Sequence, residues 1–181
     1  MNKKWDSKEE FYFSLYLDEL VDAGYVLEYE LHPKPFLLSG KSTVTVTKQL
    51  KTKVKLLEKT FLQEHIYTPD YLVMWNGSAK GLFFSEIKGG APFWLSGFPD
   101  HSYIEIKPTF SRYNMARVFS LNQKWCFNKH GVYINLVKPC ELFKKTFTPI
   151  KYLTTDKSGK SRKINYKVFS LEEYVNQKET L

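Results

Sequence analysis

The tripeptide Glu-Ile-Lys occurs twice in this 181-residue chain, at Glu86–Lys88 and at Glu105–Lys107, and each copy places two side chains with catalytic potential close together. Residues two apart in a β-strand share a face, so a strand would hold each glutamate beside its lysine. Asp70 adds a carboxylate upstream of both tripeptides. Two carboxylates and a lysine can support metal-assisted hydrolysis of a phosphodiester, because the carboxylates bind a divalent cation and the lysine can orient or deprotonate water.

The expected metal ion is Mg²⁺ or Mn²⁺, since these hard cations prefer oxygen ligands and keep water in their remaining positions. We assign its coordination to the carboxylates of Asp70 and Glu105 and to the backbone carbonyl of Ile106. Lys107 is then the water-activating group. Glu10 is the auxiliary carboxylate that could hold a metal-bound water or a second ion. The alternative is that the tripeptides form ordinary surface salt bridges.

The first half of the chain is predicted to supply a helix and a pair of strands. A helix is expected from Ser7 to Ala23, because Ser7 can cap it and its apolar residues fall on one stripe before Gly24. That stripe, continued backwards, reaches Glu10. Alternating apolar residues over 42–48 and 51–62 predict either one hairpin or one long bent strand.

The second half of the chain is predicted to contain more strands, at residues 71–75, 82–88, 102–107 and 132–137. A loop is expected over 89–101, where prolines and glycines gather, and a helix from about residue 111 to Gly131. The apolar run 132–137 is typical of a strand covered on both faces. Ser170 begins a capping box for a last short helix. One mixed α/β domain is expected, with a basic C-terminal extension from about residue 140.

The net charge of +8 is concentrated in residues 107–168, which hold fourteen Lys and Arg against Glu141 and Asp156. Such a surface favours a polyanionic partner, because lysines and arginines that neutralise phosphates release counterions. We therefore predict DNA as the partner. The predicted phosphate contacts lie on the helix after residue 111 and in the basic loop 154–163: Arg112, Arg117, Lys124, Lys129, Lys157, Lys160, Arg162 and Lys163.

Other classes of protein find little support in the sequence. No apolar run approaches the ~20 residues that span a bilayer, so no membrane association is expected. The four histidines and two cysteines lack the spacing of a zinc site, and no glycine-rich loop could cradle a nucleotide phosphate. Trp94 and Trp125 could stack on bases, although an aromatic residue on a helical stripe, as Trp125 is, more often belongs to the core.

The residues resemble the PD-(D/E)XK nuclease superfamily. The resemblance rests on Ser7–Glu10 with the apolar stripe that follows, on Thr68–Tyr71, and on Tyr103–Pro108 with the helix and strand after it. The run from Tyr103 to Pro139 is also similar to uncharacterised phage-encoded nucleases. The resemblance implies a restriction-endonuclease-like αβββαβ core and a viral origin. The lack of a membrane-spanning run and of the apolar stretch of a signal peptide predicts a soluble, intracellular protein, and with a viral origin this would be the cytoplasm of the phage host.

The two tripeptides compete for the catalytic role. Members of this superfamily often place few residues between the aspartate and the glutamate, and Glu86 is 16 residues from Asp70 whereas Glu105 is 35 residues away. Glycines and prolines after Lys88 prevent a helix there, but the segment after Lys107 can form one and return as a buried strand. This crossover would set the strand of Glu105 in the middle of the sheet. We predict Glu105 and Lys107 as catalytic, with Glu86 and Lys88 in reserve.

The sequence thus predicts a Mg²⁺-dependent DNA endonuclease, structure-specific for junctions or flaps in phage DNA metabolism. The alternative is a non-catalytic DNA-binding protein that keeps the nuclease fold. A homodimer is an expected oligomeric state, since cutting both strands of a duplex or a symmetric junction commonly needs two active sites.

Overall fold

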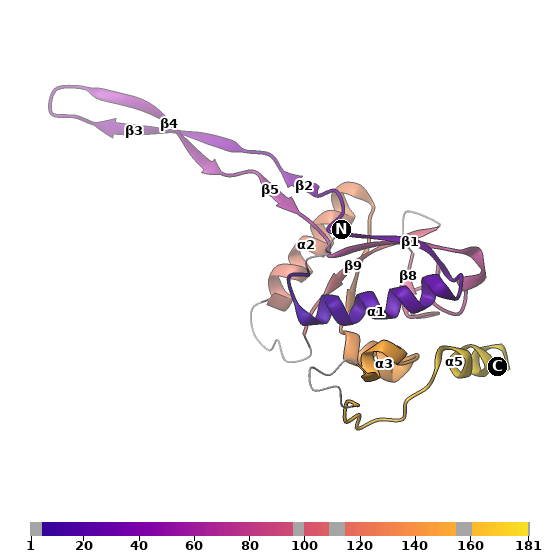
Figure 1. Ribbon diagram of the computed structural model, residues 1–181. Coiled ribbons are helices and arrows are strands. Elements are labelled where there is room, and N and C mark those ends of the chain that lie inside the picture. Colours follow the sequence, from indigo (N-terminus) through magenta and orange to yellow (C-terminus); the bar gives the residue numbers. More distant parts are fainter. Residues whose placement is uncertain (1–4, 96–99, 109–114, 155–160, 181) are drawn as a thin grey trace.

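The centre of the protein is a four-stranded mixed sheet. The computed structural model describes residues 5–95, 100–108, 115–154 and 161–180 (Figure 1). Within them the central sheet has the order β1-β6-β9-β10, formed by Val26–Leu31, Tyr71–Trp75, His101–Ile106 and Ile134–Val137. Strands β1, β6 and β9 are antiparallel neighbours, and β10 runs parallel to β9. The parallel pairing is possible because helix α2, Met115–His130, returns the chain to the end of the sheet at which β9 begins.

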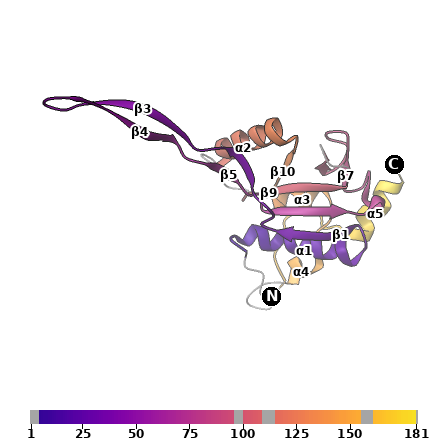
Figure 2. The same cartoon turned by 90° about the horizontal axis from the view of Figure 1, so that it is seen from above.

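Helices cover both faces of this sheet (Figure 2). Helix α1, Lys8–Asp22, packs on one face through Phe13, Leu17 and Leu20, against strand residues such as Ile104. The same core takes in residues of three helices that follow β10, namely α3 (Pro139–Lys145), α4 (Ile150–Thr154) and α5 (Leu171–Glu179). Helix α2 lies on the other face over a smaller core around Phe119 and Ile134. The protein is therefore a mixed α+β fold with one central sheet.

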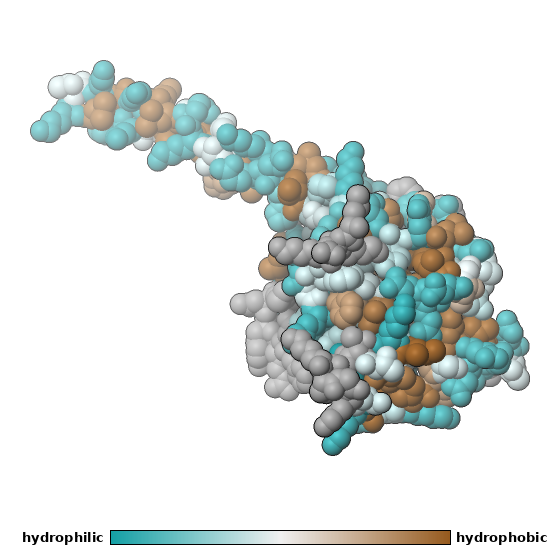
Figure 3. Space-filling model, viewed as in Figure 1, coloured by the Kyte–Doolittle hydropathy of each residue, from teal (hydrophilic) through white to brown (hydrophobic). Residues whose placement is uncertain are grey.

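A long hairpin projects from the body (Figures 1 and 2). Its base is formed by β2 (Phe36–Ser39) and β5 (His65–Tyr67), and its shaft by β3 (Ser42–Gln49) and β4 (Val54–Leu62). The sequence left a hairpin and a bent strand open, and the hairpin is confirmed. Its apolar side chains have no second layer to pack against, so Phe61 is 77% exposed. Figure 3 shows the resulting mixture of apolar and polar residues along the arm.

The predicted strand 82–88 is wrong for most of its length. Only Phe84–Ser85 forms a strand, β7, which pairs in parallel with β8, Phe93–Trp94, inside the expected loop. Both edges of β6 are already taken by β1 and β9, so β6 has no free edge for a hairpin partner. The preceding 3₁₀ turn η1, Gly77–Ala79, and the positive φ of Gly81 instead turn the chain away from the sheet.

Three predicted helix ends are confirmed, whereas the predicted start of α2 near residue 111 lies outside the described residues. The Ser7 hydroxyl accepts the backbone N–H of Glu10 at 3.1 Å, and α2 ends before Gly131, whose φ is +70°. Ser170 and Glu173 form the expected capping box of α5. Strand β10 is shorter than predicted, and Leu136 is 43% exposed, so the expectation of burial on both faces is wrong at that residue.

Candidate active site

The start of β6 and the end of β9 meet at one edge of the central sheet, and this meeting places Asp70 beside Ile106. The backbone N–H of Asp70 donates to the Ile104 carbonyl at 2.9 Å, and the Ile106 N–H donates to Asp70 Oδ2 at 2.5 Å. Antiparallel pairing of Tyr71 with Ile104 fixes this register. The structure therefore brings the aspartate to the strand that carries Glu105, across 35 residues of sequence.

Glu105 and Lys107 lie side by side, as the alternation of a strand requires. Glu105 is only 7% exposed. Its Oε1 atom forms an ion pair with Lys107 Nζ, and its Oε2 atom accepts a hydrogen bond from the Tyr67 hydroxyl at 2.7 Å. Ile104 and Ile106 point into the main core on the opposite face. Every oxygen of this buried carboxylate thus has a defined partner, which holds the side chain in one orientation.

The pKa of Asp70 is raised from 3.8 to about 7. Burial is the main cause, and the charge of Glu105 is the second; the Ile106 N–H and Lys107 oppose the rise. Two carboxylates are therefore held close together in a poorly solvated place, with one lysine to compensate them. A divalent cation would relieve this repulsion, and carboxylate oxygens are the ligands that Mg²⁺ or Mn²⁺ prefers. The donor set fits the expected metal.

Glu10 enters the same region from α1. It is 5% exposed, accepts hydrogen bonds from the Ser7 hydroxyl and the Asp6 N–H, and its charge contributes to the raised pKa of Asp70. His32 Nε2 lies 3.5 Å from Glu10 Oε2 and 3.6 Å from Asp6 Oδ2. Asp6, Glu10 and His32 each offer a ligand atom, all within 4.8 Å of one another, so this cluster could hold a metal ion.

The reserve pair lies in a different environment. Glu86 follows β7, is exposed and forms an ion pair with Lys80 at 3.0 Å. Lys88 Nζ lies over the rings of Trp94 and Tyr133, at 5.3 and 5.6 Å from their centroids. The contacts found in the described part of the chain thus join Asp70 to the second tripeptide and join the first tripeptide to other partners.

The residues predicted to contact DNA differ in their exposure. Arg117, Lys124 and Lys129 are exposed on α2, and Lys129 Nζ also donates to the Leu38 carbonyl at 3.2 Å. Lys163 is exposed as well. Arg162 instead is half-buried between Tyr12 and Tyr152, with its guanidinium 4.6 and 4.5 Å from the two ring centroids, which gives it a structural role. Three further predicted contacts lie outside the described residues: Arg112, Lys157 and Lys160.

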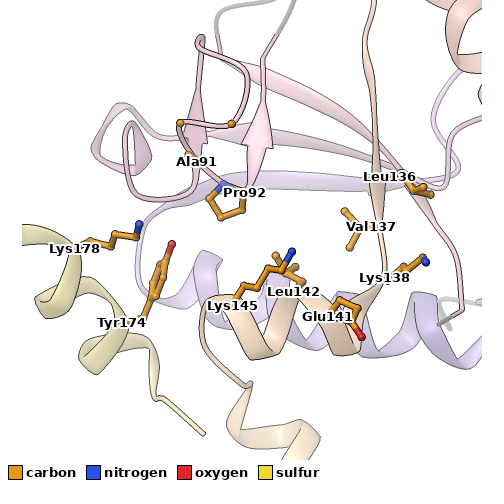
Figure 4. A pocket seen from close by; sticks show the side chains of 12 residues that line it. Ala91, Pro92, Leu136, Val137, Lys138, Glu141, Leu142, Lys145, Tyr174 and Lys178 are labelled. Atoms are coloured by element: carbon orange, nitrogen blue, oxygen red, sulfur yellow. The ribbon is translucent and has the colours of Figure 1, made fainter. Parts of the chain in front are cut away.

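A basic cleft of about 700 Å³ lies beside β10, the neighbour of the strand that carries Glu105, and was not predicted from the sequence (Figure 4). It is bounded by the loop Gly89–Pro92 and by the end of β10. Lysines at the two ends of α3 and one lysine of α5 also line it: Lys138, Lys145 and Lys178. Its wall adjoins the candidate site, because the Lys107 N–H donates to the Val137 carbonyl at 2.9 Å. No local sequence pattern unites these lysines, since they come together only when α3 and α5 pack.

Tyr67, Asp6 and His32 were also missed. Tyr67 could have been suspected, because it lies three residues before Asp70 in the same extended segment. Burial and the nearby Glu105 raise its pKa, so the hydroxyl stays a hydrogen-bond donor. His32 has a φ of +52°, a left-handed conformation that orients it toward α1 and that its sequence neighbours do not reveal.

Comparison with protein-family models, with curated proteins and with solved structures finds no match to this chain. Among the helices that the structure describes, none is long and apolar enough to cross a membrane.

Proposed function

We propose that this protein is a metal-dependent DNA endonuclease of the PD-(D/E)XK type. One observation carries the proposal: Asp70 and the Glu105-Ile106-Lys107 tripeptide meet on adjacent antiparallel strands, with the Asp70 carboxylate bonded to the backbone between Glu105 and Lys107. The order α1, β1, β6, β9, α2, β10 also agrees with the αβββαβ core that the sequence resemblance implies. The arm and the η1–β8 segment are then insertions into that core.

In this proposal each residue has a separate task. Asp70, Glu105 and the Ile106 carbonyl would hold the cation, which when bound supplies Lewis-acid stabilisation of the phosphate and a more acidic water. Lys107 would orient the attacking water and steady the negative charge that grows on phosphorus. Glu10 and His32 would position a water molecule, or hold a second ion, on the side of the site that faces α1. Tyr67 would keep Glu105 in the orientation that faces Asp70.

DNA is favoured as the substrate because several elements near the candidate site carry exposed lysines and arginines. The cleft with Lys138, Lys145 and Lys178 adjoins the catalytic strand, and exposed cations follow α2. The arm adds six lysines against two glutamates over residues 40–64. Such charge supplies affinity for phosphates without selecting a sequence. Its extent supports a substrate longer than a single nucleotide.

The decisive experiment is a cleavage assay on supercoiled plasmid and on branched DNA, with Mg²⁺ or Mn²⁺ and again with EDTA. We expect metal-dependent cleavage, and a loss of at least about 100-fold in Asp70→Asn and Lys107→Met. Lys80→Met, which removes an exposed lysine of similar chemistry, is the matched control and should cut normally. Binding of DNA with no cleavage in the presence of either metal would instead support a non-catalytic DNA-binding protein.

A further inference from the structure

A second cavity lies at the free edge of the sheet, between α2 and the end of the β7–β8 segment. Its volume is about 670 Å³, within the range of small-molecule sites. Three aromatic residues and two lysines line it, together with a glutamine that donates to the Ile134 carbonyl at 2.6 Å: Trp94, Phe127, Tyr133, Lys88, Lys124 and Gln123. None of the three aromatic residues belongs to either of the two core clusters found among the described residues.

Trp94 is fixed in place although it is not part of the core. Asn135, which is 6% exposed in β10, accepts the Trp94 N–H and donates to the Trp94 carbonyl, both at 3.0 Å. The indole N–H donates to the Glu86 carbonyl at 3.0 Å, and the ring lies 4.5 Å from that of Tyr133. The buried amide of Asn135 thus fixes the backbone of Trp94, and the Glu86 carbonyl fixes its partly exposed indole. A side chain held in this way has the property of a pre-organised binding platform.

The charge of the cavity restricts what can bind there. Lys88 lies over the rings of Trp94 and Tyr133, and Lys124 approaches from α2. Aromatic cages that bind quaternary ammonium groups lack such cations, because like charges repel. A ligand that pairs a flat ring with a negative group satisfies both features. Among common biological ligands this is the chemistry of a nucleotide, whose base stacks on aromatic rings and whose phosphate attracts lysines.

We propose that this cavity binds an unpaired nucleotide of single-stranded DNA. Bases within a duplex are stacked on their neighbours, so only an unpaired base can present its face to Trp94. Tyr133 directly precedes β10, and Leu136 of β10 pairs with Glu105. The three residues from Tyr133 to Leu136 span about 10 Å of strand. The cavity therefore lies within a few nucleotides of Glu105. The inference rests on the proposed function for its biological meaning and selects DNA with a single-stranded portion, such as a flap.

Binding is tested with the full-length Glu105→Gln variant in EDTA, using fluorescein-labelled oligo(dT) and a blunt duplex as probes. We expect Trp94→Leu to weaken oligo(dT) binding about tenfold, Trp94→Phe to weaken it less, and both to leave duplex binding unchanged. The matched control is Phe169→Leu, since Lys167 Nζ lies 4.6 Å from that ring in the same kind of contact. Lys88→Gln with Lys124→Gln should lower the salt dependence of oligo(dT) binding by about two units.

A second measurement does not depend on the folding of any variant. Oligo(dT) with bromodeoxyuridine should photo-crosslink to Trp94, Tyr133 or Phe127 in the otherwise unaltered chain. Crosslinks confined to other regions, an unchanged affinity in Trp94→Leu, or equally tight binding of free dTMP would each overturn the inference. Because binding is measured without metal, Trp94-dependent retention by a chain that never cuts DNA would reject the proposed function and leave the inference standing.

Discussion

At the scale of residues, the candidate site is a buried set of charges that is short of positive partners. Asp70 and Glu105 share one lysine, and the burial that holds them also raises the pKa of Asp70. The sequence could predict which residue types belong together, because a strand places Glu105 and Lys107 on one face. It could not predict Tyr67 as a partner of Glu105, because that hydrogen bond depends on how β5 leads into β6.

The raised pKa predicts how the stability of the metal-free protein varies with pH. Native Asp70 binds its proton more tightly than the unfolded chain does, so this contribution is complete below about pH 4 and is lost as pH rises through about 7. We therefore expect the free energy of unfolding to fall over this interval, and Asp70→Asn to flatten the fall. Urea denaturation at several pH values measures it. Mg²⁺ should stabilise the chain most above pH 7, and equal stabilisation at pH 5 would contradict this account.

Tyr67→Phe tests whether the orientation of Glu105 matters. The change removes the hydroxyl that donates to Glu105 Oε2 and leaves the ring in its core. We expect metal-dependent cleavage to fall about tenfold, which corresponds to roughly 1.4 kcal/mol for one charge-assisted hydrogen bond. Tyr29→Phe is the matched control, because its hydroxyl donates to Asp18 instead. Equal rates for the two variants would remove Tyr67 from the site.

At the scale of elements, local patterns predicted the parts of the chain whose structure depends on local contacts. The caps of α1 and α5 and the crossover from β9 through α2 to β10 follow from propensities and turn residues. The strand predicted over 82–88 does not form over its full length, because β1 and β9 occupy both edges of β6. This is a tertiary effect. Helices α3 and α4 were not predicted, since they have seven and five residues and depend on packing against α1.

The arm should be dispensable for folding of the body. Its shaft, β3 and β4, buries little, and its base closes where Ser39 pairs with His65. We expect that replacing residues 40–64 by Asn-Gly, which favours a tight hairpin turn, will leave the thermal midpoint within a few degrees of the parent. Differential scanning calorimetry measures the midpoint. Loss of the cooperative transition would show that the arm is part of the folding unit.

At the scale of the whole molecule, the basic cleft and the cavity around Trp94 both adjoin β10 but involve helices on opposite faces of the sheet, because α3 and α5 line the cleft and α2 lines the cavity. Composition predicted a basic surface but not where it lies, because lysines that are distant in the sequence come together only in the folded chain. Lys138→Gln with Lys145→Gln should lower the salt slope of duplex binding by about two units. Fluorescence anisotropy across a salt series measures it, with Lys8→Gln and Lys80→Gln together as control. Parallel slopes for both pairs would place the duplex elsewhere.

The central claim is that Asp70 acts with Glu105 and not with Glu86. The direct test compares Glu105→Gln with Glu86→Gln, two isosteric changes, after circular dichroism shows that both variants are folded. Initial rates of Mg²⁺-dependent plasmid cleavage are then measured at equal protein concentration. We expect Glu105→Gln to lose at least about 100-fold in cleavage rate and Glu86→Gln to cut at the rate of the parent. A dead Glu86→Gln variant beside an active Glu105→Gln variant would contradict the central claim.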